Sequence, residues 1–216
     1  MKNFNTLYLR RLSCVALMAG LLSLQACAPL LVGGFVEGTL VASDRRTSGI
    51  QLEDQGIEIK ANNRVKDALG DKAHVTLYSY NRQVLVLGEV ANERDAQYAI
   101  QVVSQVENVK SVVNELKVAP FASFSAKTQD LYLASKVKAN LVDTKNIYAT
   151  AFKVVAYQGT VYLMGRVTQR EADIATQVAR SASGVSKVVK VFEILSEEEL
   201  KSLMSTPVKA PSLGSK

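Results

Sequence analysis

Few residues of this 216-residue chain could carry acid–base, nucleophilic or metal chemistry. Its one histidine is His74, and its two cysteines are Cys14 and Cys27. The sequence has no HExxH metal motif, no GxSxG nucleophile motif, no glycine-rich phosphate loop and no paired CxxC. Asp67 and Asp71 stand four apart near an expected helix end, where acidic side chains are usually solvated. We therefore expect a protein that is not an enzyme and needs no metal and no cofactor, with His74 in a loop.

The chemistry that the sequence favours is lipid modification of a cysteine. Residues 1–26 combine a basic start, an apolar stretch and small residues before Cys27, which is the pattern of a secretory signal peptide. The apolar stretch is too short to cross a bilayer about 30 Å thick. The letters LQAC at 24–27 resemble the bacterial lipobox, which implies that Cys27 is acylated and becomes the first mature residue. The alternative is a soluble periplasmic protein cut by ordinary signal peptidase.

The two flanks of the mature chain show no sustained apolar period. Residues 27–56 mix Gly, Ser, Thr and charged residues, so we interpret them as the acylated N-terminus and a tether. Residues 196–216 begin with Ser196, a suitable N-cap, and three glutamates, then turn to Pro, Ser and Gly. This composition predicts one or two helical turns and an otherwise disordered tail.

Between these flanks the chain repeats itself. The segment VTLYSYNRQVLVLGEVA at 75–91 aligns without gaps with FKVVAYQGTVYLMGRVT at 152–168. After one deleted residue, 93–118 aligns with 169–194. The repeat predicts two tandem modules, at 57–118 and 127–195. Gly88 and Gly165 fall at the same position of the two copies, which indicates a bulge or a close approach of another backbone.

Each copy is expected to run helix, strand, strand, helix, strand. In the first copy, apolar periodicity predicts helices over 57–69 and 93–106 and strands over 75–80, 83–90 and 111–118. The three-letter segments NRQ and QGT between the first two strands of each copy have hairpin spacing. The order of the strands within a sheet does not follow from periodicity.

The shared residues resemble the BON domain, here in tandem. They are a Gly-x-Val strand end, an Arg and Ala in a valine-rich helix, and a final Val-Val strand. Together with DRRTSG at 44–49 and the lipobox, they look like the dual-BON outer-membrane lipoproteins. The resemblance implies an α+β fold of two small modules, each a three-stranded mixed sheet with two helices on one face. It also implies a lipid-anchored protein on the periplasmic face of the outer membrane, in keeping with Ala28 rather than Asp after the cysteine.

The two modules differ in charge. Residues 57–118 hold eight basic and eight acidic residues, whereas 127–195 hold ten basic and five acidic residues. The second module is therefore the cationic one, and nucleic acid is disfavoured as its partner by the compartment rather than by charge.

The first helix of the second module has an unusual outer side. A helical wheel over 130–142 places Leu133, Val137 and Leu141 toward the sheet. The other side is apolar with a basic rim, and its members are Leu131, Tyr132, Ser135, Lys136, Lys138, Ala139 and Val142. The matching side in the first module is mostly polar.

This composition is typical of a surface that enters the headgroup layer of an anionic membrane. We predict that these seven residues bind anionic phospholipid, that the first module does not touch the membrane, and that the protein helps to maintain the envelope barrier. The resemblance supports this, because BON domains are associated with phospholipid membranes. The alternatives are packing of this side on the first module or the tether, docking on an outer-membrane assembly protein or on peptidoglycan, and a purely structural role.

Overall fold

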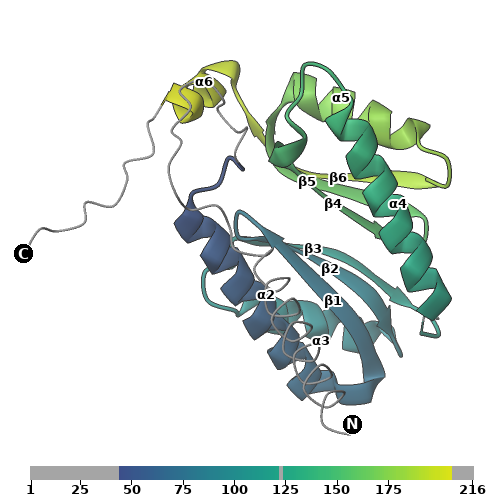
Figure 1. Cartoon of the computed structure of the whole chain (residues 1–216). Helices are drawn as coiled ribbons and strands as arrows, with labels where there is room; N and C mark the ends of the chain where they lie inside the picture. Colours follow the sequence, from purple (N-terminus) through teal and green to yellow (C-terminus); the bar gives the residue numbers. More distant parts are fainter. Residues whose placement is uncertain (1–43, 122–123, 206–216) are drawn as a thin grey trace, which may run out of the picture. The chain divides into compact units, whose positions relative to one another are not determined.

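The computed structural model describes residues 44–121 and 124–205. The first module consists of α2 (Ser48–Leu69), η2 (Gly70–Lys72), β1 (Ala73–Tyr80), β2 (Gln83–Val90), α3 (Glu93–Ser104) and β3 (Ser111–Val118) (Figure 1). The second consists of α4 (Phe124–Val142), η3 (Ala149–Ala151), β4 (Phe152–Tyr157), β5 (Thr160–Thr168), α5 (Gln169–Ser181) and β6 (Lys187–Leu195), and α6 (Glu197–Ser205) follows. The α+β class and the predicted order of elements are confirmed. The predicted signal peptide, Cys27 and most of the predicted tether lie outside the described residues.

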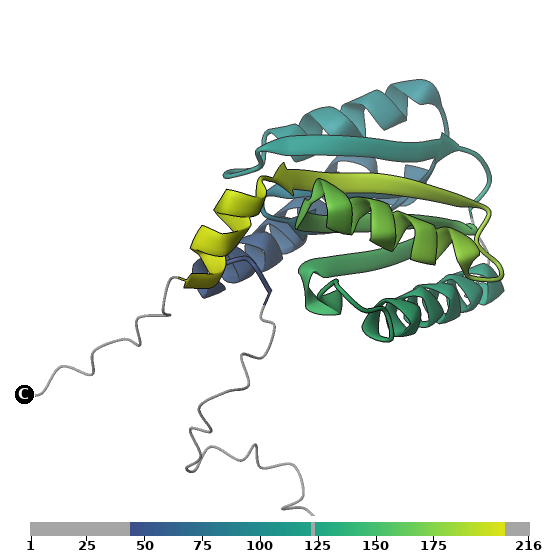
Figure 2. The same cartoon turned by 90° about the horizontal axis from the view of Figure 1, so that it is seen from above.

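Each module has a three-stranded mixed sheet, as predicted. The strand orders are β1-β2-β3 and β4-β5-β6. The first two strands of each sheet pair antiparallel, and the central strand pairs parallel with the last. A parallel pair needs a crossover connection, which α3 and α5 supply. In the second module, α4 and α5 lie side by side on the same face of the sheet (Figure 2).

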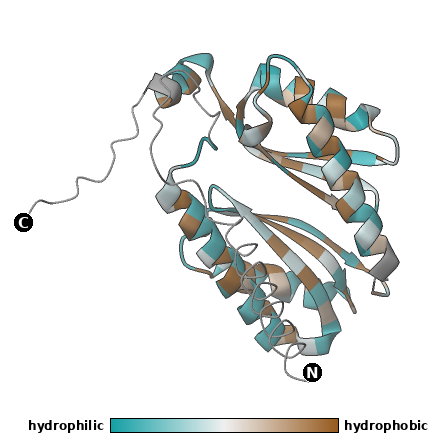
Figure 3. Ribbon diagram, viewed as in Figure 1, coloured by the Kyte–Doolittle hydropathy of each residue, from teal (hydrophilic) through white to brown (hydrophobic). Residues whose placement is uncertain are grey.

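The central strands are buried on both faces, which explains their nearly continuous apolar sequence. In β2, Val84 and Val86 point toward the helices of the first module and join its core. Leu85 and Leu87 point the other way and contact the sheet of the second module through a cluster that includes Tyr162 of β5. Unlike these central strands, α2 and α4 carry both hydrophobic and hydrophilic residues along their length (Figure 3).

Two-residue turns join the first two strands of each sheet. Asn81 and Arg82 have φ of 51° and 67°, and Gln158 and Gly159 have φ of 47° and 74°. Positive φ at both central positions is typical of a type I′ turn, whose twist matches that of the flanking strands. The hairpin spacing read from the sequence is therefore confirmed.

An aspartate from the preceding helix holds each of these turns. Asp54 of α2 accepts hydrogen bonds from both turn N–H groups of its hairpin, each at 2.8 Å. Asp130 of α4 accepts the equivalent pair at 2.8 and 3.2 Å. These carboxylates satisfy turn donors that have no partner in the strand ladder, so the same device is built twice.

The shared glycines sit where two backbones approach closely, as predicted. A Cβ atom on Gly88 would lie 2.0 Å from the carbonyl oxygen of His74. One on Gly165 would lie 2.5 Å from that of Ala151. Both glycines are therefore required by the space available, and Gly88 also by its φ of 138°.

The prediction that residues up to 56 form a tether is wrong for 48–56, because α2 begins at Ser48. Thr47 is its N-cap and accepts a hydrogen bond from the Ile50 N–H at 3.3 Å. The buried side of this extension includes Asp54, a charged residue that hydrophobic periodicity does not detect. Similarly, α4 begins at Phe124, ahead of the predicted module start at 127 and the predicted helix start at 130.

The helix predicted at the start of the tail is present as α6 (Glu197–Ser205), whose 9 residues are slightly more than the two turns expected, and 206–216 lie outside the described residues. Ser196 is its N-cap as expected: its Oγ accepts from the Glu199 N–H at 3.1 Å, and Glu199 accepts in return from the Ser196 N–H at 2.8 Å. Leu200 is buried, which gives the helix a contact that the polar sequence does not reveal. Among the described residues, none of the helices is both long enough and apolar enough to span a bilayer.

Candidate functional site

The outer side of α4 carries the apolar residues that the sequence places there. Leu131 and Tyr132 are each 70% exposed and Val142 is 65% exposed. Ser135 and Ala139 are exposed between them. We call these five residues the α4 strip. On the opposite side, Leu133, Val137 and Leu141 are buried in the core of the second module, as predicted.

The exposure of the α4 strip bears on one alternative. Large apolar side chains that are 65–70% exposed are not covered by the first module within the described residues, so the alternative that this side packs on the first module is not supported. A contiguous apolar surface of this kind is typical of a binding site. Whether these residues bind lipid stays a prediction.

The two lysines predicted at the rim are engaged within the second module. Lys136 donates to the Oγ of Ser183 and to its carbonyl oxygen at 3.3 Å. Lys138 donates to the carbonyl oxygens of Ala149 at 2.6 Å and Phe152 at 2.8 Å. Burial lowers the pKa of Lys138. Lys136 therefore borders the strip near the surface, whereas the Lys138 ammonium points inward and ties α4 to the start of β4.

A cleft of about 450 Å³ opens beside the α4 strip. It is lined by Asp44, Arg46, Tyr80, Leu131, Ala134, Ser135, Lys138, Thr150, Phe152, Lys153 and Val154. Three cations and one carboxylate in this lining make it basic. The sequence does not indicate this cleft, since its walls come from two separate segments of the chain, 44–80 and 131–154.

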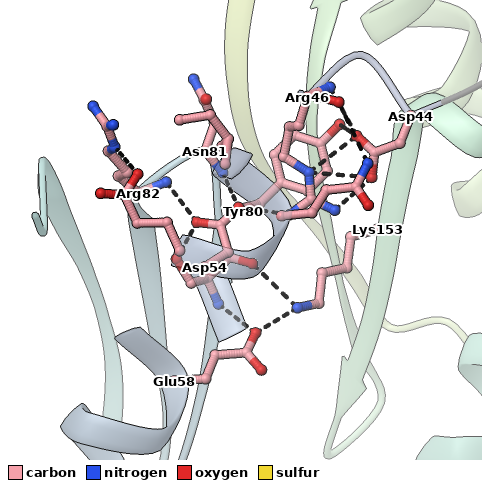
Figure 4. Close-up of polar contacts among 12 residues, drawn as sticks. Asp44, Arg46, Asp54, Glu58, Tyr80, Asn81, Arg82 and Lys153 are labelled. Atoms are coloured by element: carbon pink, nitrogen blue, oxygen red, sulfur yellow. Dashed lines mark hydrogen bonds and ion pairs between the residues drawn. The ribbon is translucent and has the colours of Figure 1, made fainter. Parts of the chain in front are cut away.

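Arg46 and Tyr80 form one wall of the cleft (Figure 4). The Arg46 guanidinium lies 4.0 Å from the centre of the Tyr80 ring and bonds Asp44 and Asp54. Burial, and then the Asp44 charge, raise the pKa of Tyr80, so its hydroxyl stays protonated and donates. Its acceptors are Asp44 and the carbonyl oxygen of Ala151, both at 3.3 Å.

Lys153 of β4 also lines the cleft and links the two modules (Figure 4). Its ammonium donates to Glu58 of α2 at 2.6 Å and to the carbonyl oxygen of Ser79 at 3.2 Å. It also lies 5.3 Å from the centre of the Tyr78 ring. Each of the lining cations therefore already has protein acceptors.

Hydrogen bonds also connect the two sheets around the apolar cluster between them. Glu89 of β2 is 2% exposed and accepts hydrogen bonds from the Tyr157 hydroxyl and from Gln158. The Tyr162 hydroxyl donates to Glu115 at 3.1 Å. Burial, together with these carboxylates, raises the pKa of both tyrosines, which keeps them neutral donors.

The pKa of Glu171 predicts acid sensitivity. Burial alone would raise it, but hydrogen bonds from Arg45 and from the Thr168 N–H outweigh burial, so the pKa is lowered. A lowered folded-state pKa contributes stability that is complete above the unfolded value, about 4.3, and is lost as the pH falls through the folded value. We therefore expect the urea midpoint of the protein to drop below about pH 4.

The control for this prediction is Arg45→Gln. Without the guanidinium, the Glu171 pKa returns toward or above its ordinary value, so the variant should be less stable at pH 6 and approach the unmodified protein at pH 3. Urea unfolding followed by circular dichroism at both pH values measures this. A constant difference between the two proteins would contradict the assignment.

The residues first considered for catalysis lie apart. His74 is exposed and stacks on Phe121, with ring centres 3.7 Å apart, at the start of β1 rather than in the predicted loop. Asp67 and Asp71 are exposed, as expected of solvated residues. Within the described ranges, no group of three or more His, Cys, Asp or Glu side chains could hold a metal ion.

Comparisons with known proteins agree with the repeat. The BON domain model matches residues 54–120 and 129–196. The chain is 38% identical over 181 residues to the outer membrane lipoprotein DolP of Haemophilus influenzae, an alignment that covers 83% of this chain and 94% of that protein.

Two further relatives cover somewhat less of the chain. The 21 kDa hemolysin of Actinobacillus pleuropneumoniae is 31% identical over 151 residues, which are 69% of this chain and 78% of that protein. Osmotically-inducible protein Y of Escherichia coli is 29% identical over 159 residues, which are 70% of this chain and 77% of that protein.

Proposed function

The chain belongs to the BON-domain family of outer-membrane lipoproteins, and from this premise we propose that it binds anionic phospholipid through its second module. The protein is held at the outer membrane by a lipid anchor. In our proposal it faces the periplasm, has no enzymatic activity and helps to maintain the integrity of the outer membrane. Cys27 carries the anchor, and the α4 strip with Lys136 is the contact surface, whereas the Lys138 ammonium bonds backbone carbonyls inside the module.

The observation that carries the proposal is the exposure of Leu131, Tyr132 and Val142 on a module with an excess of five positive charges. Moving a large apolar side chain out of water stabilises a complex by roughly 1.5–3 kcal/mol. Each basic residue close to an anionic surface adds about 1 kcal/mol. Association also costs several kcal/mol of lost translational and rotational freedom, so the strip alone is expected to bind only weakly. An acyl anchor in the same membrane would raise the effective concentration of lipid around it.

A pair of equally exposed leucines allows a matched test. Leu131 on α4 and Leu52 on α2 are each 70% exposed, and they lie in different modules. We expect Leu131→Glu to reduce binding to vesicles at least about tenfold, because it removes apolar contact and adds repulsion. Leu52→Glu adds the same charge to the first module and should bind like the unmodified protein.

The measurement is co-sedimentation of residues 28–216 with vesicles containing phosphatidylglycerol, with phosphatidylcholine vesicles as the neutral reference. Binding should weaken as salt is added, since screening reduces the attraction between surface charges. Lys136→Glu should also weaken binding, because it replaces an attractive charge beside the strip with a repulsive one. Equal binding to neutral vesicles, or equal losses for Leu131→Glu and Leu52→Glu, would contradict the proposal.

A second candidate is docking of the α4 strip on an outer-membrane assembly protein or on peptidoglycan, since exposed apolar side chains are also typical of protein interfaces. It predicts that Leu131→Glu impairs the envelope barrier in cells while the purified protein binds neither kind of vesicle. Sensitivity of cells to detergent and large antibiotics, measured beside vesicle binding, separates the two candidates.

A further inference from the structure

Two adjacent arginines ahead of α2 bond to different modules. Arg45 donates from both terminal nitrogens to the two carboxylate oxygens of Glu171 in α5, each at 2.7 Å, and to the carbonyl oxygen of Arg166 at 2.8 Å. Arg46 turns to the first module, where it bonds Asp54 of α2 at 2.6 Å. The chain is therefore held to both modules within two consecutive residues.

The contact with the second module is buried. The side chains of Arg45 and Glu171 are 6% and 1% exposed. Glu171 also belongs to the capping box of α5, where it accepts from the Thr168 N–H at 3.0 Å. Arg45 thus neutralises the Glu171 carboxylate, which is buried in the second module. Loss of either partner leaves a buried charge unpaired.

The contact with the first module is built around the same aspartate that holds the hairpin turn. Asp54 accepts from Arg46, from the hydroxyl of Ser79 at 2.6 Å and from the two turn N–H groups (Figure 4). Arg46 is held from its other side by Asp44, at 2.5–3.1 Å. Its side chain is 13% exposed.

The sequence between the anchor and these contacts has one further property. Residues 28–43, APLLVGGFVEGTLVAS, contain no lysine and no arginine. Arg45 and Arg46 are therefore the first basic residues after Cys27, and both guanidinium groups are occupied in the folded protein.

We propose that residues 44–46 form a clasp that attaches the lipid-anchored chain to both modules at once, and that the closed clasp protects the first trypsin-sensitive bonds between the anchor and the folded modules. The anchored segment is then attached where the two modules meet, rather than to α2 alone. An endoprotease of trypsin specificity releases the protein from the membrane only after the clasp opens. This inference does not depend on lipid binding by the α4 strip.

The test is trypsin treatment of the full, acylated protein in vesicles. The measured quantities are the rate at which protein appears in the supernatant and the new N-terminus of the released fragment. Release of the unmodified protein by cleavage after Arg45 or Arg46 should be slow. In Glu171→Gln, which loses the ionic partner of Arg45, we expect release at these bonds at least about tenfold faster.

Val137→Ala is the matched control, because it leaves a cavity in the core of the second module without touching the clasp. Release from Val137→Ala as fast as from Glu171→Gln would overturn the proposal, and so would an unchanged rate in Glu171→Gln. If circular dichroism shows that Glu171→Gln does not fold, Arg45→Lys decides in the same way. That variant keeps the charge and the cleavage site but loses the two-point bond, and it should release faster than the unmodified protein.

Discussion

Gly88→Ala is expected to lower the free energy of unfolding by about 3 kcal/mol or more, the combined effect of backbone strain and overpacking. The new Cβ would lie 2.0 Å from the His74 carbonyl oxygen and 2.9 Å from the Val75 Cα, both backbone atoms of the paired strand β1. The backbone φ of 138° adds strain for any residue with a side chain. The strands must separate locally, so the hairpin is disrupted.

Gly56→Ala is the control for this prediction. Gly56 lies inside α2, and apart from its chain neighbours and the backbone of its own helix no atom comes within 4 Å of the position where a Cβ would be. Alanine there should raise stability by roughly 0.5–1 kcal/mol, because glycine is costly in a helix interior. Urea unfolding of residues 28–216 followed by circular dichroism measures both variants. Similar stabilities for the two would refute the assignment of Gly88 as a close-approach position.

Asp54→Ala should cost about 3–5 kcal/mol, the range observed when one partner of a buried ionic network is removed. Asp54 is 2% exposed and accepts from four donors, which are the hydroxyl of Ser79, the N–H groups of Asn81 and Arg82, and the guanidinium of Arg46. The substitution leaves both turn donors without their acceptor and removes one of the two carboxylates that bond the Arg46 guanidinium, which keeps only Asp44.

The equivalent change in the second module, Asp130→Ala, provides a comparison within one molecule. Asp130 is only half-buried, and its recorded acceptor contacts are the two turn N–H groups. Its loss should cost about 1–2 kcal/mol. Chemical denaturation of both variants tests the difference. If the two substitutions lower the free energy of unfolding equally, the contact of Asp54 with Arg46 adds nothing to stability.

Much of the fold could be predicted because the elements repeat. Apolar periodicity predicts the strands at 83–90 and 111–118 with their observed bounds. Hairpin spacing predicts the turns, and the shared position of Gly88 and Gly165 in the two copies predicts their close backbone approach. An apolar alternation is a local property, since it depends on which faces of a strand are buried. Because the same alternation occurs in both copies, it is not a chance run of apolar residues.

Two of the errors share a physical cause, namely burial of charged residues. The extension of α2 over 48–56 resembles a tether in sequence because it mixes Gly, Ser and charged residues, and its buried side includes Asp54 in place of an apolar residue. A helical wheel predicts Lys138 at the rim of the strip because it assumes that an ammonium points to water, whereas this ammonium bonds two backbone carbonyls. A charged residue can be buried only where partners meet it, and those partners lie elsewhere in the chain.

The sequence by itself determined the two modules, the charge difference between them and the exposed apolar side of α4, because each depends on composition or on a period within one element. Only the tertiary structure decided how the modules are joined. Arg45 and Glu171 are 126 residues apart, and Lys153 and Glu58 are 95 apart. Nothing in the local pattern at 44–46 indicates such partners, because their positions follow from how the two sheets pack against each other.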